Sequence, residues 1–365
     1  MKKNIPWATP HFWGNEKKYV ADSLDSGWIS SGHYVDQLEE KFAEYCRTPF
    51  AIVTSNATTA NHMAYLALGI GPGDEVIVPG FGFLALSNIA LHVGAKPIFA
   101  DVDKKSWCVT AEKIKPLITK KTKAIAVIHT YGNVCDMDPI LALAKTNNLM
   151  VIEDAAESIG SKYKGKYSGT LGEVGIYSFQ ATKTITTGEG GAVVTNSSSL
   201  RDQMKLFRSH GMGAKKYWHK VAGHNFRITN MQAAIGCAQL EQIDKITAER
   251  SRVYKTYCEF LNKMNGVEMQ DYSSDVDPLV WAIGLRLDSI DFPQGRDKII
   301  SQLKDKGIET RPGFYSADTM PHLYGKLQLP VCKELSDSVI SLPSSPILEN
   351  EQIEFICNTL DSLRK

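Results

Sequence analysis

The sequence has no apolar run that could cross a bilayer, since a spanning helix needs about 20 predominantly apolar residues in a row. Its first twelve residues contain two lysines but no apolar stretch of the length found in a secretory signal. We therefore expect a soluble, cytoplasmic protein with no membrane partner.

An excess of charge of either sign is also missing, because 41 lysine and arginine residues face 40 aspartate and glutamate residues. The composition lacks the excess of lysine and arginine with which nucleic-acid-binding proteins attract phosphates, so we expect no nucleic acid partner. The seven cysteines are scattered without a C-x-x-C pair, as in proteins whose thiols stay reduced. His219 and His224 lie five residues apart in a predicted loop, which is too little to predict a metal site.

What the sequence does contain is an alternation of strand-like and helical segments between about residues 35 and 210. A strand is predicted at 96–100, and the apolar, β-branched runs at 124–129 and 150–153 are typical of strands buried on both faces. Residues 139–147 have helical spacing between two of these strands. Strands that alternate with helices predict right-handed crossovers and a largely parallel sheet, so the fold class is α/β.

The pattern changes beyond about residue 230. Residues 231–261 predict one long helix, and further strands are predicted at 279–287 and near Ile308. This mixture predicts a smaller α+β domain at the C-terminal end. We expect a large α/β domain, which includes the N-terminal segment, at residues 1–240 and the small domain at 241–365.

A lysine stands at the end of a predicted buried strand in the run S-F-Q-A-T-K-T, Ser178 to Thr184. The glycine-rich run T-G-E-G-G follows, and a second strand then begins. Burial at a strand end lowers the pKa of a lysine and makes its amine a usable nucleophile. Most lysines in turns are solvated, so the motif alone leaves Lys183 either a catalytic amine or a surface residue.

Two carboxylates lie three residues apart in the run V-I-E-D-A-A-E-S, at Asp154 and Glu157. Side chains at the carboxyl ends of strands lie where open α/β sheets bind ligands. An aspartate in this place can keep a pyridine nitrogen protonated. The segment alone is equally compatible with a metal-binding aspartate or with a helix N-cap at Asp154.

Small polar residues join a strand to a helix in the run T-S-N-A-T-T-A-N-H, residues 54–62. The free N–H groups of such a helix start suit a phosphate, although simple capping by Ser55 or Asn56 gives the same pattern. Phe81 and Phe83 follow another strand end, where an aromatic ring either stacks on a flat ligand or belongs to the core.

A fourth motif, G-H-N-F-R-I-T-N-M-Q-A-A-I-G, covers residues 223–236. Polar side chains at Asn225, Arg227, Thr229 and Asn230 crowd the start of an alanine-rich helix. A helix of such small residues can pack closely against a neighbour, including one from a second subunit.

Together, and in this order, these segments resemble the sugar aminotransferase family (the DegT/DnrJ/StrS group) of fold-type I pyridoxal-phosphate enzymes, whose fold is like that of aspartate aminotransferase. The resemblance runs from W-I-S-S-G at Trp28 to Arg311 and Pro312. Within the family, the motifs K-T-I-T-T-G-E-G-G, V-I-E-D-A-A-E and N-F-R-I-T-N-M-Q-A-A-I-G are most similar to those of GDP-perosamine synthases.

The resemblance implies pyridoxal 5′-phosphate as the cofactor, with Lys183 as the catalytic residue that forms a Schiff base with it and later moves a proton. It implies that Asp154 pairs with the pyridine nitrogen and that Glu157 lies near the ring hydroxyl. Phe83 takes the position of the stacking aromatic residue.

The remaining implied contacts concern the phosphate and the substrate. Ala57 and Thr58 occupy the phosphate-loop positions, and Ser178 adds its hydroxyl. Asn225 would reach the phosphate from a second subunit, so the resemblance implies a homodimer with shared active sites. The implied substrate-binding residues are Trp28, Ser30, Ser31 and Gly32.

The implied reaction is a ping-pong transamination from L-glutamate to the 4-keto carbon of a nucleotide-linked 4-keto-6-deoxy sugar. The chain departs from the family where Asn56, Ala57 and Thr58 replace the usual S-G-T and where residues 314–322 read F-Y-S-A-D-T-M-P-H. These departures leave open a small ketone, such as a cyclitol or ketose phosphate, as the acceptor. A cofactor-binding relative without turnover is the alternative from another class.

Overall fold

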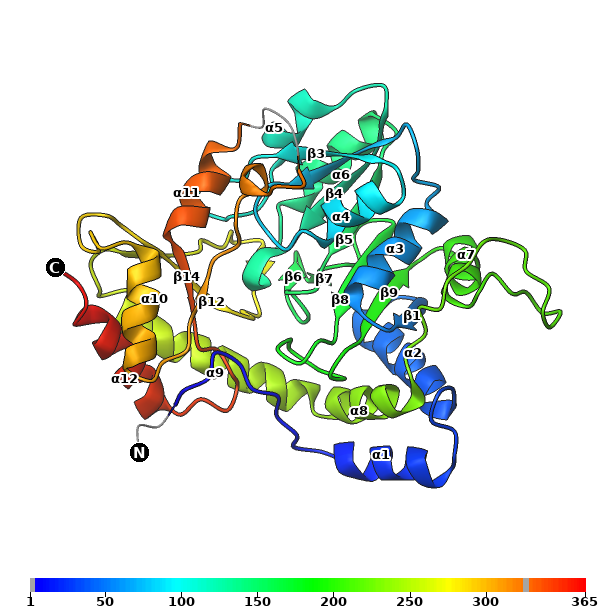
Figure 1. Cartoon of the computed structure of the whole chain (residues 1–365), viewed down its shortest axis with the longest axis horizontal. Coiled ribbons are helices and arrows are strands. Elements are labelled where there is room, and N and C mark those ends of the chain that lie inside the picture. Colours follow the sequence, from blue (N-terminus) through cyan, green and yellow to red (C-terminus); the bar gives the residue numbers. More distant parts are fainter. Residues whose placement is uncertain (1–3, 324–327) are drawn as a thin grey trace.

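The computed structural model describes residues 4–323 and 328–365 and is built around a seven-stranded sheet in the order β1-β9-β8-β5-β4-β2-β3 (Figure 1). The strands are β1 (Phe50–Thr54), β2 (Glu75–Pro79), β3 (Lys96–Ala100), β4 (Thr122–Ile128), β5 (Met150–Asp154), β8 (Val174–Ser178) and β9 (Gly191–Thr195). The five strands from β3 to β8 are parallel, whereas β9 is antiparallel to both β8 and β1. The predicted α/β class with a mostly parallel sheet is confirmed.

Helices cover both faces of this sheet because successive strand residues point to opposite sides. Ala124 and Ala126 of β4 belong to one core together with residues of α3 and α4, and the alternating Ile125 and Val127 belong to another with residues of α5 and α6. The helices of this part are α1 (Glu16–Asp25), α2 (His33–Cys46), α3 (Ala57–Ala67), α4 (Ala85–His92), α5 (Ala111–Ile114), α6 (Met137–Thr146), α7 (Ser198–Arg208) and α8 (Asn230–Glu241), with the 3₁₀ turns η1 (Lys115–Leu117) and η2 (Thr130–Gly132).

The C-terminal part has its own sheet and core. Its sheet has the order β10-β12-β14-β13, with β10 (Val267–Met269), β12 (Ile283–Leu287), β13 (Arg311–Pro312) and β14 (Val339–Leu342). The accompanying helices are α9 (Ile243–Leu261), α10 (Arg296–Asp305), η3 (Ala317–Thr319), α11 (Pro330–Ser338) and α12 (Asn350–Asp361). Ile5, from the other end of the chain, is buried in the same core. A small third sheet joins β6 (Lys162–Tyr163), β7 (Lys166–Tyr167) and β11 (Val276–Asp277).

Three predicted elements differ from the structure. The single helix expected over 231–261 is two helices, because Gln242 leaves helical geometry and closes α8 with a bond to the carbonyl of Gln239. The strand expected at 279–287 is confined to β12, since the backbone before it turns aside to bond with the loop after β4. Ile308 forms only an isolated bridge with Ile5, a partner from the other end of the chain that no local pattern reveals.

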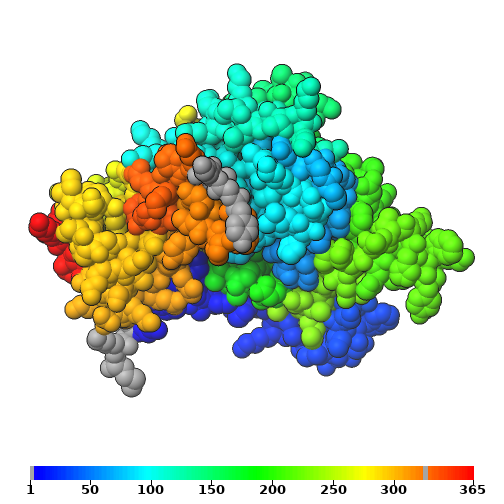
Figure 2. Space-filling model, turned by 45° about the horizontal axis from the view of Figure 1, so that its top comes forward, coloured from blue at the N-terminus to red at the C-terminus, as the bar shows by residue number. Residues whose placement is uncertain are grey.

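The segment after α7 protrudes beyond the body of the molecule (Figures 1 and 2), and its Tyr217 and Trp218 are exposed. Within residues 4–323 and 328–365, no helix is both long and apolar enough to span a bilayer.

The core of the C-terminal sheet provides a test of the fold. Leu285 is fully buried in β12 between β10 and β14, so Leu285→Ala should cost about 2–5 kcal/mol of stability through lost burial and the cavity left behind. Leu24→Ala, at a half-exposed site on α1, should change stability by less than about 0.5 kcal/mol. The midpoints of thermal unfolding of the cofactor-free proteins measure both, and equal midpoints for the two variants would contradict the assignment of this core.

Candidate active site

Strand ends of the large sheet bring the predicted site residues to one edge. Gly191, the first residue of β9, pairs with Thr54 at the end of β1 and with Ser178 at the end of β8. A Cβ at position 191 would lie 2.6 Å from the backbone nitrogen of Ala57. Only glycine allows this approach, which places the first turn of α3 beside the end of β8.

The first turn of α3 offers unpaired donors. Asn56 caps the helix, because its side chain accepts the N–H of Thr59 at 2.8 Å. The N–H groups of Ala57 and Thr58 have no acceptor among the residues that the structure describes. The hydroxyl of Ser178 accepts from the N–H of Gln180 at 3.3 Å and keeps its own proton free to donate. Capping by Asn56 therefore leaves two N–H groups free, and these donors suit a phosphate.

Lys183 lies in the segment between β8 and β9, and its side chain is only 13% exposed. Its Nζ lies 3.6 Å from Oε1 of Glu157. Burial lowers the pKa of Lys183, although the nearby carboxylates of Glu157 and Asp154 act in the opposite direction. The amine of Lys183 is thus available as a nucleophile at lower pH than that of an exposed lysine.

Both predicted carboxylates are buried beside this lysine. Burial raises the pKa of Asp154 and of Glu157, and Lys183 opposes the rise in each case. An oxygen of Glu157 accepts the N–H of Tyr131 at 3.0 Å. Asp154 accepts the N–H of Ala156 at 3.0 Å, but the residues after it form a turn, so the alternative of a helix N-cap is wrong.

One oxygen of Asp154 remains available to a ligand. Its only side-chain contact is a long one of 3.5 Å from the amide nitrogen of Asn61, within the described part of the chain. The amide oxygen of Asn61 is itself buried without a hydrogen-bond partner there. A buried carboxylate and an unpaired amide oxygen fit a ligand with a polar ring nitrogen better than they fit a closed core.

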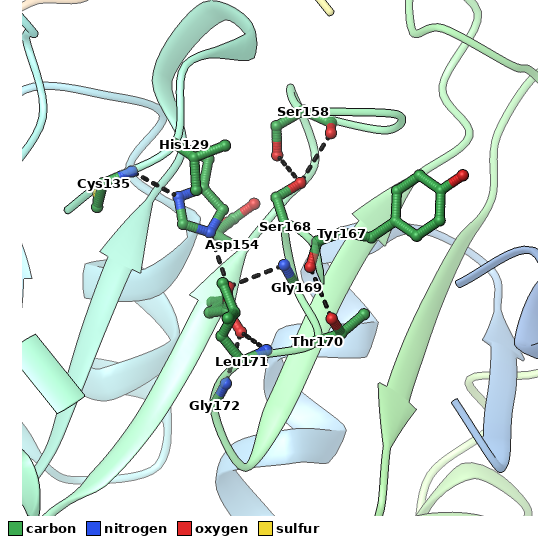
Figure 3. A network of polar contacts seen from close by, with 12 residues as sticks. His129, Cys135, Asp154, Ser158, Tyr167, Ser168, Gly169, Thr170, Leu171 and Gly172 are labelled. Carbon is green, nitrogen blue, oxygen red and sulfur yellow. Dashed lines mark hydrogen bonds and ion pairs between the residues drawn. The ribbon is translucent and has the colours of Figure 1, made fainter. Parts of the chain in front are cut away.

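A buried network holds the strand that carries Asp154 (Figure 3). The carboxylate of Glu153 accepts hydrogen bonds from the backbone N–H groups of Gly169, Leu171 and Gly172 and from the ring of His129. The N–H of Cys135 donates to Nδ1 of His129, so Nε2 carries the proton that bonds to Glu153 at 2.9 Å. The backbone N–H of His129 in turn donates to the carbonyl of Asp154 at 3.0 Å. Asp154 is therefore fixed by neighbours whose own polar groups are paired.

Two other predicted site residues, Phe83 and Asn225, are exposed in the single chain. Phe83 follows β2 and is 62% exposed, whereas Phe81 belongs to the core. Asn225 is exposed on a segment that bridges to Ser209. The structure joins neither Phe83 nor Asn225 to the cluster of Lys183, Asp154 and Glu157 by any described contact.

The predicted substrate loop, Trp28 to Gly32, is exposed but anchored. The amide nitrogen of Asn230 donates to the carbonyl of Trp28 at 2.7 Å, and its amide oxygen accepts the N–H of Tyr34 at 3.0 Å. A Cβ at Gly32 would lie 2.6 Å from the Asn230 side chain. The start of α8 therefore sets the position of this loop.

Sequence reasoning missed three contributors to the site. Trp281 places its ring over Lys183, and Arg250 of α9 donates to the carbonyl of Lys183 at 3.3 Å. Neither residue stands in a motif with the lysine, so no local signal identifies them. Asn61 lies within the motif of residues 54–62, and its position one helical turn after Ala57 could have indicated that both residues face the sheet edge.

This arrangement suits a class of enzyme that would hold a phosphate at a helix start, a ring nitrogen at a buried aspartate and an aldehyde at a buried lysine. The model of the DegT/DnrJ/EryC1/StrS aminotransferase family matches residues 12–361. The chain belongs to this family, and its cofactor is pyridoxal 5′-phosphate.

Relatives of the chain match it over nearly its full length. It is 45% identical to the GDP-perosamine synthase of Escherichia coli O157:H7 and 41% identical to that of Caulobacter vibrioides, in each case over 98% of both chains. Its structure is similar to the pyridoxal-phosphate form of a protein from Streptococcus pneumoniae described as a sugar aminotransferase, with a TM-score of 0.93, 25% identity and coverage of 99% of this chain and 98% of the other.

The glycine at the start of β9 allows a test of the phosphate position. Gly191→Ala should lower the affinity for pyridoxal phosphate by at least about tenfold, because the new methyl group displaces the first turn of α3 and its donors. Gly71→Ala is the matched control, since a Cβ there meets nothing closer than 3.8 Å. Absorbance titration of the cofactor-free proteins measures the affinities, and unchanged binding by a folded Gly191→Ala protein would contradict this site.

Proposed function

We propose that this aminotransferase takes the amino group of L-glutamate and delivers it to the 4-keto carbon of a nucleotide-linked 4-keto-6-deoxy sugar. The observation that carries the proposal is the full-length similarity to GDP-perosamine synthases at 45% and 41% identity. That similarity makes GDP-4-keto-6-deoxymannose the leading acceptor.

The residues of the site suit the steps that such a transfer requires. Pyridoxal phosphate supplies an electron sink when it is bound. Asp154 would keep the pyridine nitrogen of the cofactor protonated. The negative carboxylate and the positive pyridinium would each favour the ionised form of the other. Lys183 would carry the covalent attachment and then move a proton between substrate and cofactor carbons, a role that suits an amine whose pKa is lowered by burial. Ala57, Thr58 and Ser178 would hold the phosphate.

Replacement of the lysine tests the catalytic assignment. Lys183→Ala should reduce formation of aminosugar from glutamate and GDP-4-keto-6-deoxymannose by at least about 10³-fold, because both the attachment point and the proton carrier are lost. Lys298→Ala, at an exposed lysine of α10, should retain activity. Mass spectrometry of the nucleotide sugars measures the product, and borohydride reduction followed by peptide mapping should place the cofactor on Lys183 in the wild-type protein.

The visible absorption of the cofactor, measured together with the product assay, separates the rival functions. An aminotransferase should lose its visible cofactor absorption when glutamate is added, whereas a non-catalytic relative would keep the absorption unchanged. If glutamate bleaches the protein but only a cyclitol ketone or a ketose phosphate is aminated, the nucleotide-sugar part of the proposal is wrong.

We also propose that two copies of the chain form a homodimer with shared active sites. Asn225 is exposed, and its segment bridges to Ser209 directly after α7, so its side chain is accessible to a neighbouring copy of the chain. Trp28 is likewise 65% exposed and open to contact with a neighbouring copy.

Mixing two inactive variants tests the sharing. Asn225→Ala and Lys183→Ala homodimers should each have low activity at limiting cofactor. In a mixed dimer of a C2 assembly, one site combines the intact lysine of one chain with the intact asparagine of the other, so random exchange should restore up to about a quarter of wild-type activity. If Asn225 serves its own chain, no site becomes complete and mixing restores nothing.

We place the enzyme in the cytoplasm. All seven cysteines are free thiols, and six of them are buried. Thiols that stay unpaired in this number are typical of a reducing compartment.

A further inference from the structure

The amine of Lys183 lies against the face of an indole ring. Its Nζ is 3.6 Å from the centre of the ring of Trp281 and equally 3.6 Å from the nearest oxygen of Glu157. Trp281 is 5% exposed, so water does not separate ring and amine. An indole face attracts an ammonium ion, and the attraction is stronger where both are desolvated.

The ring is fixed by bonds to the lysine's own segment and to the loop after β4. Its Nε1–H donates to the carbonyl of Thr182, the residue before the lysine, at 2.7 Å. The backbone N–H of Trp281 donates to the carbonyl of Tyr131 at 3.0 Å, and the backbone N–H of Tyr131 donates to the carboxylate of Glu157. The two groups that flank the amine, the indole and the carboxylate, are therefore connected through a single residue.

A buried arginine completes this support. Arg250 donates from Nη1 to the carbonyl of Trp281 at 3.1 Å and from Nη2 to that of Lys183 at 3.3 Å. The hydroxyl of Ser344 donates to the Trp281 carbonyl as well, at 3.0 Å. One guanidinium group thus binds the main-chain carbonyls of both Trp281 and Lys183. This shared contact fixes the position of the indole ring relative to the amine.

We propose that Trp281 is a positioning residue for Lys183, and that its indole face holds the protonated amine in the site whenever this amine is not bonded to the cofactor aldehyde. The inference rests on the catalytic role proposed for Lys183. A long lysine side chain released from its bond would otherwise lose orientation, and a proton carrier must stay within hydrogen-bond reach of the atoms it serves. Arg250 repels the ammonium ion and Glu157 attracts it, and the ring fixes its place between them.

The proton affinity of Lys183 in the cofactor-free protein gives a readout that does not depend on turnover. The rate at which acetic anhydride acetylates Lys183, followed across pH by peptide mass spectrometry, reports the pKa of this amine. Trp281→Leu should lower the proton affinity of Lys183 about tenfold, since the ring that stabilises the charged form is gone. Trp281→Phe keeps a ring face and should stay within about threefold of wild type.

Kinetics of the loaded enzyme give the second readout. Trp281→Leu should reduce kcat about tenfold or more, with little change in KM for glutamate, because the lost interaction concerns the released lysine. Trp107→Leu is the matched control: it removes another buried indole beside Tyr131, one that makes no contact with Lys183. This control should lose stability but keep the proton affinity of the lysine.

Three outcomes overturn the inference. These are an unchanged proton affinity in Trp281→Leu, an equal loss in Trp281→Phe, or the same loss in Trp107→Leu. If Trp281→Leu does not fold, fluorinated tryptophans placed at position 281 by nonsense suppression preserve shape while weakening the ring face, and proton affinity should fall with each added fluorine. If the wild-type protein does not retain cofactor on Lys183 after borohydride reduction, the proposed function is refuted instead. The acetylation experiment would then still test whether Trp281 stabilises the protonated amine.

Discussion

Removing a lysine amine from water is unfavourable, and the site depends on how its neighbours offset that cost. Burial pushes Lys183, Asp154 and Glu157 towards their neutral forms, while their mutual attraction pushes all three towards their charged forms. Burial and charge thus act on each of the three groups in opposite directions, as is common at sites of acid–base chemistry.

The fold holds these groups still by pairing what surrounds them. The Glu153 and His129 network fixes the strand of Asp154, and the close approach of Gly191 to α3 fixes the phosphate donors beside Ser178. Each support comes from a different strand end, as is usual where open α/β sheets bind ligands. The cluster of Lys183, Asp154 and Glu157 consequently depends on the whole sheet edge. No single sequence motif contains all of its supports.

Sequence reasoning predicted the large sheet well because its strands are continuous apolar runs. The strand at Lys96–Ala100 has the predicted bounds, and β4 and β5 differ by one or two residues at their ends. The family resemblance, not the single motifs, implied that Lys183, Asp154 and Glu157 share one site, and the structure brings the three side chains together. Prediction failed at the bridge of Ile308 to Ile5, because the two partners lie at opposite ends of the chain. It also failed at the break between α8 and α9, where only a local change of backbone geometry at Gln242 interrupts the helical spacing.

In the site, too, residues within sequence motifs could be predicted, whereas residues brought in from distant parts of the chain could not. Trp281 follows Lys183 by almost a hundred residues and is brought to it by the packing of the C-terminal part, which no spacing rule describes. Exposed residues such as Asn225 and Phe83 present the opposite difficulty. Their motifs are clear, but their side chains have no partner among the residues that the structure describes.

The contact between Gly32 and Asn230 has a consequence for divergence within the family. The loop at Gly32 and the start of α8 are about 200 residues apart, yet a methyl group at one position would overlap the amide at the other. A larger residue at 32 can therefore be accepted only together with a smaller one at 230, and that exchange would also remove the amide that grips the carbonyl of Trp28. Homologues that alter this pair should consequently differ in the position of the loop from Trp28 to Gly32, so residues 32 and 230 should vary together.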